Sequence, residues 1–127
     1  MVYRILVVDD SKLARMAVAK MFSAVGPHWV RVEASGAEEA MSLAKASHFD
    51  VALVDFNMPE RDGLHLVADL KAIAPGMVLA VISANYQKEV VERTEAIGAT
   101  FLPKPLTEPA LRAFLFETES KLEAGNT

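Results

Sequence analysis

Carboxylates, a hydroxyl and a lysine follow the short apolar runs of this 127-residue chain, each at the point where a run ends. They are Asp9 and Asp10 after the first run, Asp55 after the third, Ser83 after the fourth and Lys104 after the fifth. Carboxylate oxygens with no histidine or cysteine among them suit a hard divalent cation such as Mg²⁺. A cation, an ammonium group and a hydroxyl around one carboxylate are also what transfer of a phosphoryl group to that carboxylate requires.

Asp55 has an ordinary interpretation when it is taken alone. It follows the apolar run Val51–Val54, and turn residues follow it at Pro59 and Gly63. Aspartate commonly ends a strand or caps a turn without carrying any chemistry. A run this short and this apolar is typical of a strand buried on both faces. Sheets of such strands bind ligands at the carboxyl ends of their strands, so the meaning of Asp55 depends on the other strand ends.

The elements that would position these side chains alternate regularly along the chain. Apolar or alternating runs predict strands at Tyr3–Val8, Trp29–Val32, Val51–Val54, Met77–Ile82 and Thr100–Leu102. Apolar residues at helical spacing predict helices at Ser11–Val25, Ala37–Ala46, Gly63–Ala74, Gln87–Ile97 and from a Thr107 cap to about Leu122. Five strands alternating with five helices predict an α/β fold, in which helices cover both faces of a parallel sheet.

The carboxyl ends of parallel strands lie along one edge of the sheet, and neighbouring strands are about 4.8 Å apart. Asp9, Asp10 and Asp55 would therefore converge within reach of one ion if the first and third strands are neighbours. Three carboxylates this close would raise one another's pKa unless a cation neutralised them. Asp55 is then the central carboxylate and the expected nucleophile, with Ser83 as a hydroxyl donor and Lys104 as a positive charge.

Asp10 and Arg15 also have simpler interpretations. Asp10 is also a candidate N-cap of the first helix, and capping does not compete with metal binding. Arg15 falls on the outer side of the same helix together with Lys12 and Lys20, where it would be solvated. Glu33 follows the second predicted strand and so belongs to the same edge of the sheet.

The composition limits the other classes of function. Hydrophobic residues make up 52% of the chain, enough for the core of one domain. The net charge is −4 and there is no basic tract, which argues against nucleic-acid binding. Cysteine is absent, which excludes disulfides, a thiol nucleophile and a zinc–thiolate site. The apolar N-terminus is too short to span a membrane and lacks the features of a signal peptide, so we expect a cytoplasmic protein.

Taken in order, these residues resemble the receiver domain of two-component response regulators, most closely the single-domain, chemotaxis-type members. The resemblance covers nearly the whole chain and rests on Asp9–Asp10, Asp55-Phe-Asn-Met-Pro59 with Asp62–Gly63, Ser83–Ala84, and Lys104–Pro105. It implies a flavodoxin-like, doubly wound sheet of five parallel strands in the order 2-1-3-4-5, with five helices. It also implies a receiver domain over residues 1–124, a short tail at 125–127 and no output domain.

The resemblance implies a role for each motif residue. Asp55 would accept the phosphoryl group, and Lys104, whose peptide bond to Pro105 would be cis, would pair with that group. Mg²⁺ would be held by Asp9, Asp10, Asp55 and the backbone carbonyl of Asn57. Ser83 would serve as the switch hydroxyl in place of the commoner threonine. The remaining implied roles are the switch aromatic at Phe101 and phosphoryl access at Ala84 and Asn85. Phe101 fits a plain core phenylalanine equally well, because it lacks a hydroxyl that would mark an outward state.

The implied activity is signalling rather than turnover of a substrate. A histidine kinase or a histidine phosphotransfer protein would donate the phosphoryl group to Asp55. The new charge would draw Ser83 and Lys104 inward and let Phe101 rotate. The face formed by the fourth helix, fifth strand and fifth helix would then change for an unidentified protein target. We expect a monomer or a weak homodimer with no nucleic-acid or membrane partner.

Two other functions use the same residues. A phosphohydrolase with an aspartyl nucleophile would show Asp-x-Asp after the first strand, whereas the sequence there is Asp9-Asp10-Ser11. A glycine-rich phosphate loop is also missing, which disfavours nucleotide hydrolysis. A receiver-like module that is never phosphorylated would have no need for the acidic pair, Ser83 and Lys104 that this chain retains.

Overall fold

The computed structural model describes residues 2–58, 62–84 and 87–125, and five strands alternate with five helices along them. The strands are β1 (Arg4–Val8), β2 (Val30–Ala34), β3 (Val51–Asp55), β4 (Val78–Ser83) and β5 (Thr100–Pro103). The helices are α1 (Lys12–Val25), α2 (Ala37–Ala46), α3 (Gly63–Ile73), α4 (Lys88–Ala96) and α5 (Glu108–Gly125). Every predicted strand and helix is confirmed, and the differences lie at the ends of elements.

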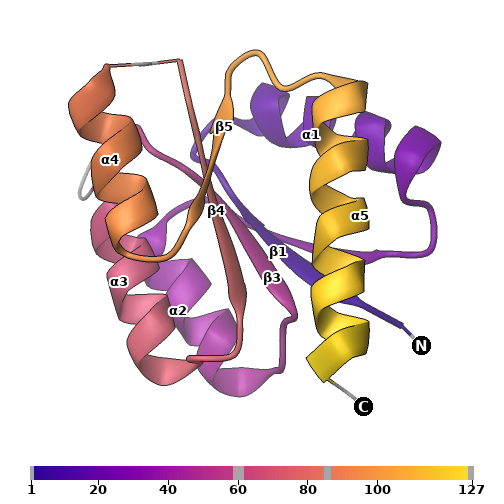
Figure 1. Ribbon diagram of the computed structural model, residues 1–127, viewed down its shortest axis with the longest axis horizontal. Helices are drawn as coiled ribbons and strands as arrows, with labels where there is room; N and C mark the ends of the chain where they lie inside the picture. Colours follow the sequence, from indigo (N-terminus) through magenta and orange to yellow (C-terminus); the bar gives the residue numbers. More distant parts are fainter. Residues whose placement is uncertain (1, 59–61, 85–86, 126–127) are drawn as a thin grey trace.

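The five strands form one parallel sheet in the order β2-β1-β3-β4-β5. Figure 1 shows α1 and α5 on one face of this sheet and α2, α3 and α4 on the other. The predicted flavodoxin-like order and the doubly wound arrangement are therefore both confirmed. In this order β1 and β3 are neighbours, which is the condition under which the acidic residues at their ends can meet.

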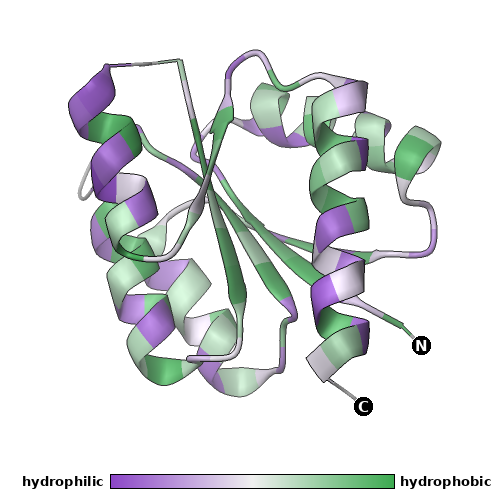
Figure 2. Ribbon diagram, in the orientation of Figure 1, coloured by the Kyte–Doolittle hydropathy of each residue, from purple (hydrophilic) through white to green (hydrophobic). Residues whose placement is uncertain are grey.

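Each face of the sheet packs against its own layer of helices. Successive residues of a strand point to opposite faces, so Leu6 and Val8 face α2 and α3, while Ile5 and Val7 face α1 and α5. All five residues of β3 are buried, as predicted for a strand covered on both sides. Figure 2 shows the same pattern, with apolar strands between helices that carry both apolar and hydrophilic residues. Within the sheet, polar side chains therefore lie on the edge strands or at the ends of the inner strands.

Most predicted bounds are shifted by one or a few residues, and three of these differences affect the interpretation. Ser11, not Asp10, is the N-cap of α1, and its hydroxyl accepts a hydrogen bond from the Ala14 amide at 3.2 Å. β2 begins at Val30, after Trp29, whose buried indole packs 5.1 Å from the Tyr3 ring and donates to Glu119. The last helix continues to Gly125, beyond the predicted end near Leu122. Asp10 is thus left without a capping role.

Gly63 lets α3 begin directly against the end of β3. Its amide donates to the Phe56 carbonyl at 2.8 Å, and Asp62 caps the helix by accepting from the His65 amide at 3.0 Å. A Cβ atom at Gly63 would lie 2.5 Å from the Asp55 carbonyl oxygen and 2.9 Å from the Phe56 Cα atom. Both neighbours are backbone atoms and cannot rotate away, so close packing here requires glycine.

We therefore predict that Gly63→Ala lowers the free energy of unfolding by roughly 1–3 kcal/mol, the usual cost of forcing extra volume into a packed site. Gly76→Ala is the matched control, because a Cβ atom there would meet nothing within 4 Å. The control should stay within about 0.5 kcal/mol of the parent chain in urea denaturation. Equal stability of the two variants would contradict the close approach of α3 to β3.

Candidate functional site

The register of the sheet brings the predicted side chains to one edge. Val8 pairs with Val54, so Asp9 follows β1 beside the point where Asp55 ends β3. Ser83 is the last residue of β4 and pairs with Pro103, the last residue of β5. Lys104 follows at once, and its amide donates to the Ser83 carbonyl at 2.9 Å. Four of the five strands thus contribute a polar group to one short stretch of this edge.

The three carboxylates form a compact cluster. One oxygen from each of Asp9, Asp10 and Asp55 lies within 4.8 Å of the other two. Asp55 is only 3% exposed and Asp9 only 6%, whereas Asp10 is exposed. The cluster offers oxygen donors alone, with one side open to water. That donor set fits Mg²⁺, which prefers carboxylate oxygens and keeps several of its waters.

Lys104 supplies the positive charge inside this cluster. Its Nζ atom lies 2.9 Å from Asp55 Oδ1 and 3.8 Å from Asp9 Oδ2. The Lys104–Pro105 peptide bond is cis, as the resemblance implied. The ammonium group therefore contacts the central carboxylate directly and one of its acidic neighbours at longer range.

The pKa values of Asp55 and Lys104 are both shifted by burial and by the charges around them. Burial raises the pKa of the Asp55 carboxyl and Asp9 adds to the rise, although Lys104 and the backbone of Asn57 oppose it. Burial alone would lower the pKa of Lys104, but its contact with Asp55 and the charges of Asp9 and Asp10 raise the pKa above its ordinary value. Lys104 is therefore a stable cation, and the acidic cluster keeps an excess of negative charge that favours a metal ion.

The other predicted residues lie around this centre at different depths. Ser83 is completely buried at the end of β4, and Phe101 is half-buried on β5 beside Val81. Ala84 and Asn57 are exposed, each just past the end of its strand. Asn85, predicted to border phosphoryl access, lies outside the described residues, as does the loop 59–61.

Arg15 belongs to this edge although its place in the sequence put it on the outer face of α1. Its side chain is only 16% exposed, and it contacts the backbone of Asp9 and the carboxylate of Glu33. The one sequence signal for this contact was the position of Glu33 at the end of a strand. Helical periodicity could not reveal it, because an arginine side chain is long enough to leave the face on which its Cα atom lies.

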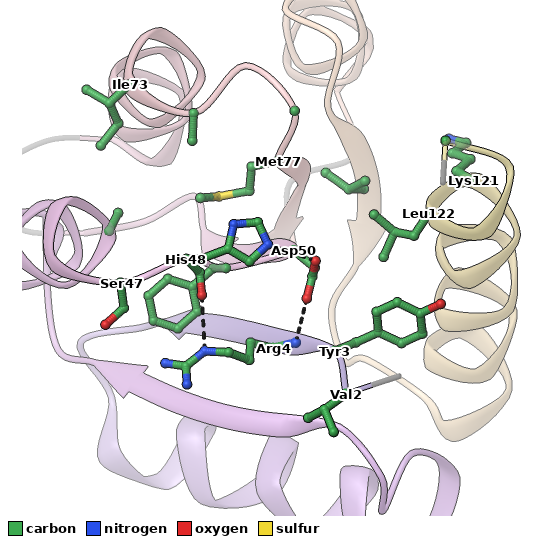
Figure 3. Close-up of a pocket in the computed structure, with 16 residues that line it drawn as sticks. Val2, Tyr3, Arg4, Ser47, His48, Asp50, Ile73, Met77, Lys121 and Leu122 are labelled. Atoms are coloured by element: carbon green, nitrogen blue, oxygen red, sulfur yellow. Dashed lines mark hydrogen bonds and ion pairs between the residues drawn. The ribbon is translucent and has the colours of Figure 1, made fainter. Parts of the chain in front are cut away.

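A hollow of about 830 Å³ lies at the opposite edge of the sheet (Figure 3). Three of its polar residues contact one another. The Arg4 amide donates to Asp50 at 2.8 Å, the Arg4 guanidinium donates to the His48 carbonyl at 3.0 Å, and the His48 ring lies 3.0 Å from Asp50. The predicted site residues that the structure describes lie at the other end of the strands. The acidic edge is therefore the candidate site.

Comparison with known proteins agrees with this geometry. The sequence matches the family model of the response regulator receiver domain over residues 5–116. The transcriptional regulatory protein PdtaR of Mycobacterium tuberculosis is 36% identical over 107 residues, which are 82% of this chain and 50% of that protein. A response regulator receiver protein of Anaeromyxobacter is 33% identical over 109 residues, 85% of this chain and 45% of that protein. The chain thus spans about half the length of these curated relatives.

Solved structures share the fold over almost their whole length. Chemotaxis protein CheY4 of Vibrio cholerae superposes with a TM-score of 0.83 at 26% identity, covering 93% of this chain and 99% of that one. A CheY-like receiver domain protein of Methanospirillum hungatei, at 22% identity, shares the fold with a TM-score of 0.89 over 98% and 99% of the two chains.

Among the residues that the structure describes, no helix has the length and apolar character needed to cross a membrane.

Three observations point to the same family: the sheet order, the cluster of acidic residues at the ends of β1 and β3, and the match of the family model to most of the sequence. The chain belongs to the family of response regulator receiver domains.

Proposed function

We propose that this chain is a phospho-accepting switch of a two-component system. In this proposal Asp55 takes a phosphoryl group from a phosphohistidine on a histidine kinase or a histidine phosphotransfer protein. The observation that carries the proposal is the buried Asp55 carboxylate, held 2.9 Å from Lys104 Nζ and beside the carboxylates of Asp9 and Asp10. A carboxylate that merely ended a strand would need neither a buried position nor this surrounding charge.

The proposed transfer moves one group between two side chains. An Asp55 oxygen attacks phosphorus, the bond from phosphorus to the donor's ring nitrogen breaks, and its electron pair returns to the imidazole. Lys104 then faces phosphoryl oxygens in place of the carboxylate, and the Ser83 hydroxyl donates to the same group. Mg²⁺, bound through Asp9, Asp10, Asp55 and the backbone carbonyl of Asn57, would offset the charge that gathers on the transferred group.

The signal would leave through the strands that hold these two partners. Ser83 ends β4 and Lys104 follows β5, so a new charge at Asp55 acts on both strands at once. Phe101 on β5 would move with them, and a protein target would recognise the face made by α4, β5 and α5. Ala84 and Asn85 would border the path of the donor and of water. The domain would work in the cytoplasm, as a monomer or weak homodimer.

The competing proposal is a magnesium-dependent phosphohydrolase that uses the same nucleophile. Such an enzyme needs a second acid or base beside the acceptor, two residues further along the chain. Here that position is Asn57, an amide that can donate and accept hydrogen bonds but cannot take up a proton from water. We therefore favour a phosphorylated state that persists over rapid turnover.

We predict that acetyl phosphate and Mg²⁺ add the mass of one phosphoryl group to the protein, as an adduct that is stable in acid and lost in base. Asp55→Asn should remove the adduct completely, because Asp55 is the carboxylate in direct contact with Lys104 Nζ, at 2.9 Å, whereas the Asp9 carboxylate lies 3.8 Å away. Asp50→Asn is the matched control, because Asp50 directly precedes β3 whereas Asp55 ends it, and this variant should still be labelled. Intact-mass spectrometry reads the result. An adduct that survives in Asp55→Asn, or turnover of many phosphomonoesters, would overturn the proposal.

We also predict that Mg²⁺ stabilises the parent chain, by about 2.7 kcal/mol when its concentration is a hundred times the dissociation constant. Asp10→Asn should abolish most of this gain, because Asp10 is the exposed member of the acidic cluster and the carboxylate most accessible to a hydrated ion. Glu38→Gln removes an exposed carboxylate from α2 and should leave the gain intact. Thermal unfolding with and without EDTA measures the effect, and equal gains in both variants would place the ion elsewhere.

A last prediction concerns the lifetime of the phosphorylated state. Asn57→Asp should speed loss of the phosphoryl group by about tenfold, because it adds a base beside the path of water. This expected effect is smaller than the roughly hundredfold acceleration that a well-positioned base contributes. Asn57→Ala removes the amide without adding a base and separates the two effects. The decay of the phosphorylated mass after removal of the donor is the measurement. An unchanged decay in Asn57→Asp would show that this side chain does not border the water path.

A further inference from the structure

The polar atoms of Asp9 are held on several sides. Its amide donates to the Ala34 carbonyl of β2 at 3.1 Å, and its Oδ1 atom accepts from the Ser11 amide at 2.9 Å. Its Oδ2 atom lies 3.8 Å from Lys104 Nζ. Its carbonyl oxygen accepts from Arg15 Nη1 at 2.6 Å. Asp9 is thus held by Ala34 of β2, by Ser11, by Lys104 and by Arg15, which lies one helical turn into α1.

Asp10 is held much less directly. It is exposed, and within the described part of the chain its carboxylate makes no hydrogen bond or ion pair. It is not the cap of α1 either, since Ser11 has that role. Its direction therefore depends on the backbone that carries it, and the first part of that backbone is the Asp9–Asp10 peptide group. Because a peptide group is planar, fixing its oxygen atom fixes the direction in which the Asp10 Cα atom leaves.

Arg15 is the residue that fixes this oxygen. Its guanidinium group is a planar fork, and each of two nitrogens has its own partner. Nη1 donates to the Asp9 carbonyl oxygen at 2.6 Å, and Nε donates to Glu33 Oε1 at 3.1 Å. Glu33 belongs to β2, so the fork joins α1, β2 and the loop that carries the acidic pair. With a side chain only 16% exposed, Arg15 has little freedom to move away.

We propose that Arg15 is a positioning residue for the metal site: it fixes the Asp9–Asp10 peptide so that the Asp10 carboxylate faces Asp9 and Asp55, and Glu33 holds its guanidinium in that place. This inference rests on the proposed binding of Mg²⁺ at the acidic cluster. Arg15 touches none of the three carboxylates through the contacts described, so it acts on the ion only through the backbone. Groups that orient metal ligands in this way typically change metal affinity by about 10–100-fold when they are removed.

The test keeps the charge and removes the fork. Arg15→Lys retains a cation but offers one point donor in place of two fixed ones. We expect its dissociation constant for Mg²⁺, measured by calorimetric titration of the metal alone, to rise by about tenfold. Its unfolding midpoint without Mg²⁺ should change little. Arg31→Lys is the matched control, because Arg31 also lies beside Glu33, at 3.7 Å, but makes no described contact with Asp9. The control should leave the Mg²⁺ affinity within about twofold.

Two further variants separate positioning from simple charge repulsion and from misfolding. If Arg15 only repelled the metal ion, Arg15→Gln would bind Mg²⁺ more tightly than the parent chain, and that result would overturn the inference. Glu33→Gln weakens the hold on the guanidinium without altering α1, and we expect affinity to fall by several-fold. If the Arg15 variants do not fold, Glu33→Gln tests the inference instead. Unchanged Mg²⁺ affinity in Glu33→Gln would count against a positioning role for the Arg15 guanidinium.

The failure of this inference can be told apart from the failure of the proposed function. A parent chain that binds Mg²⁺, together with an Arg15→Lys variant that binds it equally well, would overturn only the positioning role. A parent chain that binds no Mg²⁺ at all would overturn both.

Discussion

The structure depends on one buried carboxylate held against one lysine. Asp55 is almost inaccessible at the end of β3, and removing a carboxylate from water is unfavourable unless opposite charge compensates it. Lys104 lies 2.9 Å away, yet the pKa of Asp55 remains raised, because burial and Asp9 together outweigh the ammonium group. The negative charge of Asp55 is therefore only partly compensated. Burial of the apolar strands on both faces of the sheet stabilises the fold in spite of this unfavourable charge.

The same burial explains how much of the protein could be predicted from sequence. A strand covered on both sides must be continuously apolar, so β3 and β4 were evident, and the first polar residue after each had to lie at the edge. The placement of Asp9, Asp55, Ser83 and Lys104 follows from that rule and from the parallel order of the strands. The edge strand β2 was harder, because its alternating, partly exposed residues resemble a loop, and its true extent follows from pairing with all of β1.

The remaining errors come from competition between neighbouring side chains. Asp9, Asp10 and Ser11 can all accept a hydrogen bond at the start of α1, and sequence does not say which of them does. In the structure Asp9 accepts from the Ser11 amide, which brings the Ser11 hydroxyl to the Ala14 amide and leaves Asp10 free of both tasks. Arg15 escaped prediction for a related reason, since one of its two partners is the backbone carbonyl of Asp9, and a backbone carbonyl has no signature in the sequence.

A count of charges links the acidic edge to the proposed switch. Three carboxylates face one ammonium group, so the local excess is two negative charges, which one divalent cation would neutralise. Phosphorylation would replace the single charge of Asp55 with about −1.5 to −2, so a negative excess would return with Mg²⁺ in place. Lys104 and the Ser83 hydroxyl are the groups placed to meet it, and the backbone hydrogen bond between them ties the ends of β4 and β5 together. The extra charge would therefore act on two joined strands, while β1 and Asp9 stay held by β2 and α1.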